Sequence, residues 1–194
     1  MPGPDSVCPS YLGATGELLS PPSTGFEEPG SWTTLTAKPC SSTVANASTG
    51  NACSGSAFLT CNGAVRQAPW DGPVMTATPN FIQGHTYAVT AALRYSPESA
   101  PTTASPLAIT CIRICNGGAT DYSSIGSVAY STYEWVRISG EVTASLAGCS
   151  ALSEFRFYVN TVAKQETYDS VDMDDFRIYD LTAGKGVSSP THHY

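Results

Sequence analysis

Trp70 is the side chain whose type and setting most suggest a chemical role. It stands between Pro69 and the turn-forming pair Asp71-Gly72, a context in which a large ring is expected to be partly exposed. An exposed indole can stack on a flat apolar ligand surface such as the face of a sugar ring, whose hydroxyl groups then need planar polar partners nearby. The alternative interpretation is that Trp70 only covers an edge of the core.

Polar side chains that could supply such partners alternate with apolar ones further along the chain. Within residues 154–161, the alternation sets Phe155, Phe157 and Val159 against Arg156, Tyr158 and Asn160. Tyr158 and Asn160 are therefore expected to point away from the core. Arg94 and Arg156 could add bidentate hydrogen bonds to ligand hydroxyl groups. A lone arginine is more often a surface cation with another partner, so that alternative stays open for both.

Composition and charge exclude several classes of function. The chain has 194 residues, of which 41% are hydrophobic and 13% charged, and its formal net charge is −7. This length allows one domain with a full core. Binding to a phosphate backbone needs clustered Lys and Arg, so no nucleic-acid partner is expected. No run approaches the roughly 20 apolar residues of a membrane span, so no membrane insertion is expected either.

The cysteine content predicts disulfides. The seven cysteines are Cys8, Cys40, Cys53, Cys61, Cys111, Cys115 and Cys149. None forms a CxxC pair and the chain has only three histidines, so a zinc site lacks its usual ligands. Disulfides indicate an oxidising compartment, and we expect a secreted or cell-surface protein. We favour a Cys53–Cys61 pair across a short Gly-rich loop, and we expect Cys111 and Cys115 to lie too far apart along one strand to join each other.

Almost nothing in the sequence is typical of a helix, and apolar positions recur with a period of two. The predicted strands are residues 84–95, 107–115, 133–144, 154–161 and 171–179, the last with an irregularity at its paired aspartates. Their core-facing residues are predicted to include Tyr87, Val89, Ala91, Leu93, Val136, Ile138, Val142, Met173, Phe176 and Ile178. Trp32 and Trp135 are interpreted as packing at the sandwich edge. Turn-forming clusters separate the strands, which indicates an antiparallel β-sandwich over residues 16–182, with flexible ends at 1–15 and 183–194.

Five segments in a fixed order carry a resemblance to a known family. They are GFEEPGSW at 25–32, SAFLTC at 56–61, VRQAPWDGP at 65–73, FIQGHTYAVTAALRY at 81–95 and YEWVRISGEVT at 133–143. In this order they resemble segments of the carbohydrate-binding modules of families four and twenty-two. Each motif alone is unspecific. Together they indicate an all-β jelly roll of the galactose-binding-domain type, whereas function is less strongly implied because one fold hosts many tasks.

The resemblance implies a secreted, non-catalytic module that binds a polysaccharide or glycan, appended to an enzyme or to a cell-surface protein. Trp70 matches the position of a binding tryptophan in the family twenty-two modules, and Tyr158 and Asn160 match a tyrosine and a glutamate that line the groove. In the resembling modules the equivalents of Glu27 and Asp174 hold a structural calcium, which takes carboxylate oxygens readily. The alternative is that Asp172, Asp174 and Asp175 are solvated turn carboxylates.

Two other functions remain open at the level of the sequence. A structural or adhesion domain could use the same sandwich to contact a protein, through a flat apolar patch instead of an aromatic groove. A jelly-roll polysaccharide lyase is the enzymatic alternative. No GxSxG, HExxH or Gly-rich phosphate loop occurs, and apart from Glu27 and Asp174 no two carboxylates are evident partners for hydrolysis of a glycosidic bond.

Overall fold

The computed structural model describes residues 32–33, 41–44, 52–53, 57–75, 80–96, 105–128, 134–161 and 169–182. The elements are β1 (Trp32–Thr33), β2 (Ser41–Val44), β3 (Ala57–Cys61), the 3₁₀ turn η2 (Gly63–Val65), β4 (Val74–Met75), β5 (Thr86–Tyr95), β6 (Leu107–Cys115), β7 (Thr120–Val128), β8 (Val136–Thr143), β9 (Leu152–Thr161) and β10 (Val171–Asp180). Glu27 and the predicted flexible ends lie outside the described residues.

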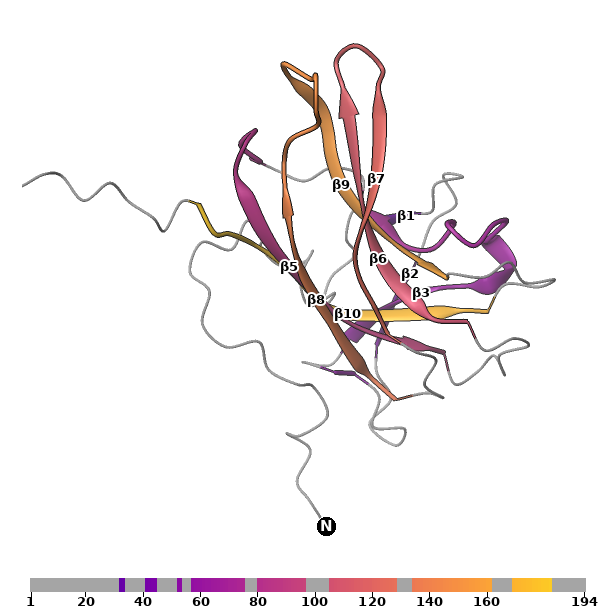
Figure 1. Ribbon diagram of the computed structural model, residues 1–194. Helices are drawn as coiled ribbons and strands as arrows, with labels where there is room; N and C mark the ends of the chain where they lie inside the picture. Colours follow the sequence, from indigo (N-terminus) through magenta and orange to yellow (C-terminus); the bar gives the residue numbers. More distant parts are fainter. Residues whose placement is uncertain are drawn as a thin grey trace, which may run out of the picture.

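The strands form two antiparallel sheets that pack face to face, as Figure 1 shows. One sheet has the order β1-β4-β9-β6-β7 and the other the order β2-β3-β10-β5-β8. Because neighbours in each sheet are mostly distant in sequence, the chain crosses repeatedly between the layers, as in a jelly roll. The predicted all-β antiparallel jelly-roll sandwich is confirmed.

The core lies between the sheets and uses the faces that the alternation predicted. Tyr87, Val89, Ala91 and Leu93 of β5 pack against Phe155, Phe157 and Val159 of β9 and against residues of β6, β8 and β10. Aromatic rings connect the layers, with centroids 5.4 Å apart for Tyr87 and Phe155 and 6.1 Å apart for Phe157 and Phe176. Val136, predicted to face the core together with Ile138, is only half-buried because it lies at the start of β8.

The predicted irregularity at the paired aspartates is a β-bulge in β10. The register with β5 shifts between Asp174 and Arg177, and Asp175 has a left-handed φ of 47°. In a regular strand, side chains an even number of positions apart face the same side. The bulge shifts this alternation by one residue, so Met173 and Phe176 both face the core although they are three positions apart. The aspartates are not solvated turn residues. Asp172 and Asp174 are fully buried and Asp175 is 8% exposed, so that alternative was wrong.

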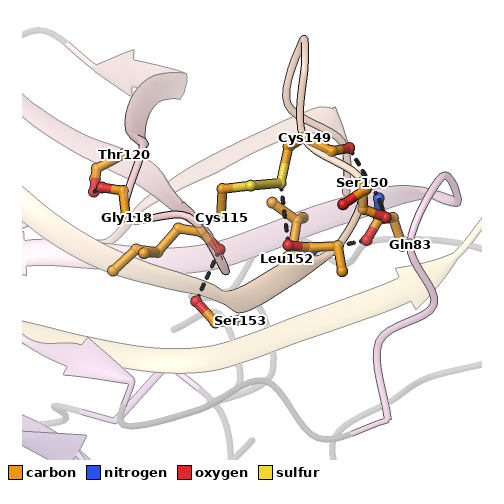
Figure 2. Close-up of a disulfide and its surroundings, with 10 residues drawn as sticks. Gln83, Cys115, Gly118, Thr120, Cys149, Ser150, Leu152 and Ser153 are labelled. Atoms are coloured by element: carbon orange, nitrogen blue, oxygen red, sulfur yellow. Dashed lines mark hydrogen bonds between the residues drawn. A yellow bond between two sulfur atoms is a disulfide. The ribbon is translucent and has the colours of Figure 1, made fainter.

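Four of the described cysteines are in disulfides, as the sequence predicted of its cysteines in general. A disulfide joins Cys115, at the end of β6, to Cys149 in the β8–β9 turn (Figure 2). Cys53 and Cys61 are each disulfide-bonded, as expected of oxidised cysteines, and the bond that we favour between them stays a prediction. Cys53 packs with Phe58 on the outer face of β3, whereas Cys61 shares the inward parity of Leu59.

Cys111 is the free cysteine among those described, and it is buried in the core. Burial raises the pKa of its thiol to about 12, so the thiol stays protonated at neutral pH. It does not join Cys115, as the sequence predicted.

Candidate functional site

The outer face of the β1-β4-β9-β6-β7 sheet carries three of the five predicted binding residues. Arg156, Tyr158 and Asn160 of β9 alternate with the core residues and therefore point outward together. The register sets further side chains beside them on the same face: Thr110 and Val74 opposite Tyr158, Ala108 opposite Asn160, and Ile112 opposite Arg156.

Tyr158 forms the apolar floor of this face. It is 6% exposed and packs with Val74 and Ile112. Burial raises the pKa of its hydroxyl, and a hydrogen bond with Thr110 opposes that rise. The Tyr122 hydroxyl raises the pKa further, and its strand β7 is separated from β9 by β6. Tyr158 is thus a buried support rather than a fully exposed platform.

Tyr122 is a candidate contact that the sequence analysis missed. It lies on the edge strand β7, opposite Ile112, and is 60% exposed. No strand is predicted from the sequence between 107–115 and 133–144, because β7 consists largely of small polar residues that carry little strand signal. The available clue was a single aromatic residue in the run TDYSSIGSV, because a ring surrounded by Ser and Thr has no apolar neighbours in sequence to bury it.

The segment that carries Trp70 is docked along the edge of β9. The amides of Val159 and Thr161 donate to the carbonyls of Pro73 and Pro69 at 2.8 and 2.9 Å. Gly72 lies against the β9 backbone so closely that a Cβ there would overlap the Val159 carbonyl oxygen. The loop is therefore an added edge of the outer face, next to Asn160.

Buried polar contacts hold this loop in one shape. Arg66 is 4% exposed and donates to the carbonyls of Asp169, Asp71 and Pro69 at 2.5, 3.3 and 3.3 Å. The Asp71 carboxylate accepts from the amide of Gln67 at 2.9 Å. Trp70 itself remains 57% exposed. An exposed aromatic ring on a rigid loop loses little conformational freedom when a ligand stacks on it.

Arg156 lies on the same outer face as Tyr158 and forms an ion pair with Glu154. Its Nε lies 3.0 Å from Oε2 of Glu154, and the side chains are 25% and 43% exposed. The pair lies within one strand, two residues apart, and neutralises the charge at this end of the face.

Arg94 is placed elsewhere. It lies on the outer face of the other sheet, is 3% exposed, and its Nε donates to Oδ2 of Asp172 at 2.9 Å. Its guanidinium stacks over Trp135 and Phe58, 4.2 and 5.0 Å from the ring centroids. The predicted packing role of Trp135 is confirmed. The side chain of Trp32 is outside the described residues.

Comparison with solved structures identifies the architecture. The CBM22-1 xylan-binding domain of Paenibacillus barcinonensis Xyn10C superposes with a TM-score of 0.67 at 21% identity, covering 88% of this chain and 98% of that one. The C-terminal family 22 module of Clostridium thermocellum Xyn10B gives 0.63 at 19%, covering 81% and 90%. The chain has the fold of a family 22 carbohydrate-binding module.

A third similar structure places such a module beside a catalytic one. The CBM22-1–GH10 modules of Clostridium thermocellum Xyn10B, complexed with xylohexaose, give a TM-score of 0.63 at 14% identity, covering 87% of this chain and 29% of that one. No protein-family model and no curated protein matches the sequence. Among the described residues, no helix is long and apolar enough to cross a membrane.

Asp174 is the described member of the predicted calcium pair. It is fully buried at the bulge, where Oδ2 accepts from the amide of Cys53 at 2.8 Å and Oδ1 accepts from the amide of Asp175 at 2.7 Å. Carboxylate oxygens are ligands that a hard cation such as Ca²⁺ prefers, so Asp174 is of the right chemical type for the predicted site. No cluster of three or more His, Cys, Asp or Glu is formed within the described ranges.

Proposed function

We propose that this protein binds a polysaccharide non-covalently, through the outer face formed by β9, β6, β7 and the Trp70 loop. The observation that carries the proposal is the pair of exposed rings, Trp70 at 57% on the loop docked along β9 and Tyr122 at 60% on β7, with β6 and β9 between them. The similar CBM22-1 domain of Paenibacillus barcinonensis Xyn10C is a xylan-binding domain, so a xylan is the first ligand to test.

Binding on this face would rest on stacking and hydrogen bonds. The rings of Trp70 and Tyr122 offer flat surfaces to sugar C–H groups, and Asn160 and Arg156 offer donors to sugar oxygens. Glycoside hydrolysis needs two carboxyl groups that flank one bond. The Glu154 carboxylate on this face is paired with Arg156, which favours binding without catalysis.

Titration of xylohexaose, cellohexaose and soluble xylan tests the proposal. We expect binding by the wild type, and a loss of tenfold or more, about 1.4 kcal/mol, for Trp70→Ala and for Tyr122→Ala. Ile82→Ala is the matched control, because Ile82 is also a large exposed side chain (51%) but precedes β5. Unchanged affinity in Trp70→Ala would show that the Trp70 loop is not part of the binding site. A folded wild type that binds none of these sugars would favour an adhesion domain.

The proposed setting is extracellular. The Cys115–Cys149 disulfide and the oxidised Cys53 and Cys61 support an oxidising compartment. The fold also occurs attached to a GH10 module, which supports a role in holding an appended enzyme on its polysaccharide.

We also propose a structural calcium held by Asp174 and Glu27. A buried carboxylate in a strand that pairs with β3 and β5 suits a cation that ties the ends of the domain together. Thermal unfolding in calcium and in chelator is the test. The melting temperature should fall in chelator for the wild type, and the difference should vanish in Glu27→Gln, which leaves the Cys53–Asp174 contact intact. A melting temperature insensitive to chelator would exclude the calcium.

A further inference from the structure

The Asn160 side chain has a fixed orientation. Thr110 Oγ1 lies 2.9 Å from Oδ1 of Asn160, and Nδ2 lies 3.5 Å from the carbonyl oxygen of Thr161. The amide nitrogen lies on the side of the Thr161 carbonyl, which can only accept, and the hydroxyl of Thr110 donates to Oδ1. The acceptor of the amide is thereby occupied by the protein.

What remains for a ligand is a donor. The amide nitrogen carries two hydrogens and only one can point at Thr161, so the other is available on the outer face. Arg156, four residues before it on the same strand, also has donors only, and its Nε lies 3.0 Å from the Glu154 carboxylate. On either side of Tyr158 along β9, the amide and the guanidinium therefore offer hydrogens to a ligand, and the carboxylate of Glu154 lies beside the guanidinium.

We infer that Thr110 sets the specificity of this face by holding Asn160 as a neutral hydrogen-bond donor toward acceptor oxygens of an uncharged sugar chain. The inference rests on the proposed polysaccharide binding. Hydroxyl, ring and glycosidic oxygens of such a chain all accept from an N–H. An anionic polysaccharide is disfavoured, because Arg156 is already neutralised and the protein carries a net charge of −7. Thr110 acts through Asn160 and is a positioning residue.

An isosteric charge change provides the sharpest test. Asn160→Asp has the same shape, but its ionised carboxylate can only accept, whereas the protonated form regains a donor. We expect this variant to bind the preferred neutral hexasaccharide, xylohexaose or cellohexaose, at least tenfold more weakly than the wild type at pH 7. Its affinity should recover as the pH falls below the carboxyl pKa near 4, while wild-type affinity stays flat from pH 4 to 7.

Variants of Thr110 test the positioning. Thr110→Val keeps the volume but removes the hydroxyl, and we expect about fivefold weaker binding, restored within twofold by Thr110→Ser. Thr143→Val is the matched control, since it removes a comparable hydroxyl pair, 3.1 Å to Thr86 Oγ1, on the other sheet. It should leave affinity unchanged.

The outcomes separate the two proposals. Wild-type binding to a neutral hexasaccharide with Asn160→Asp equal to it at pH 7, or with no recovery at low pH, overturns the donor assignment alone. Tighter wild-type binding to hexagalacturonate than to the neutral sugars overturns the uncharged ligand class. Failure of the wild type to bind any sugar overturns the binding face itself, and with it this inference.

Discussion

A single side chain shows how far alternation in a sequence can lead. The pattern of β5 correctly set Arg94 opposite the core residues, and an outward arginine was then interpreted as a ligand contact. The outer face of that sheet is covered by Cys53, Phe58 and Trp135, so Arg94 meets Asp172 and two rings instead of solvent. Parity along a strand is a local property, whereas the cover over a face comes from distant segments and cannot be read from the strand itself.

The burial of this pair predicts a structural role for Arg94. Replacing it by Met in Arg94→Met leaves the buried Asp172 without its cation, and loss of one partner of a buried pair costs about 3–5 kcal/mol. Urea unfolding measures this. Arg156→Met is the matched control on the open face, where an exposed ion pair contributes less than about 1 kcal/mol. Equal destabilisation by the two variants would contradict the assignment. Sugar affinity of the folded Arg94→Met protein should equal that of the wild type.

At the scale of elements, the sequence predicted the five long strands with dense apolar alternation and missed β7. That strand is an edge, and its exposed positions carry Thr, Tyr and Ser, so its pattern lacks the contrast that marks a half-buried strand. It pairs antiparallel with β6 and also contacts β8, the edge of the opposite sheet. Gly126 and Gly140 let the two backbones approach, since a Cβ at Gly126 would lie 3.1 Å from the Ile138 side chain.

Gly140→Ala tests that closure. The added methyl group would overlap the Ile125 carbonyl oxygen, so β7 and β8 must separate. Forcing extra volume into a packed contact costs about 1–3 kcal/mol. Gly117→Ala in the β6–β7 turn is the control, because nothing lies within 4 Å of a Cβ there. Unfolding free energies should drop for the first variant and hardly change for the second. A stable Gly140→Ala protein would show that this edge of the sandwich is loose.

At the scale of the whole molecule, a disulfide and two hydrogen bonds connect the two sheets at one end of the sandwich. Cys115 ends β6 of one sheet, while Cys149 lies in the turn that leaves β8 of the other. Gln83, which precedes β5, donates to the carbonyl of Ser150 at 3.1 Å and accepts from the amide of Leu152 at 2.8 Å (Figure 2). The sequence predicted oxidised cysteines but not this pairing, because the ends of strands in opposite layers meet only after the sandwich is assembled.

Removing the Cys115–Cys149 disulfide should lower the stability of the fold without changing the proposed binding face. The disulfide closes a separation of 34 residues, and the chain-entropy model assigns such a loop about 4 kcal/mol. We therefore expect Cys115→Ser/Cys149→Ser to lower the unfolding free energy by about 2–4 kcal/mol in urea titrations, with affinity for the preferred hexasaccharide unchanged below the melting temperature. Gln83→Ala, which removes hydrogen bonds at the same end but keeps the disulfide, should cost less than half as much. Lost affinity in the folded double variant would mean that this end and the Trp70 face are coupled, whereas unchanged stability would mean that packing between the sheets already holds the end closed.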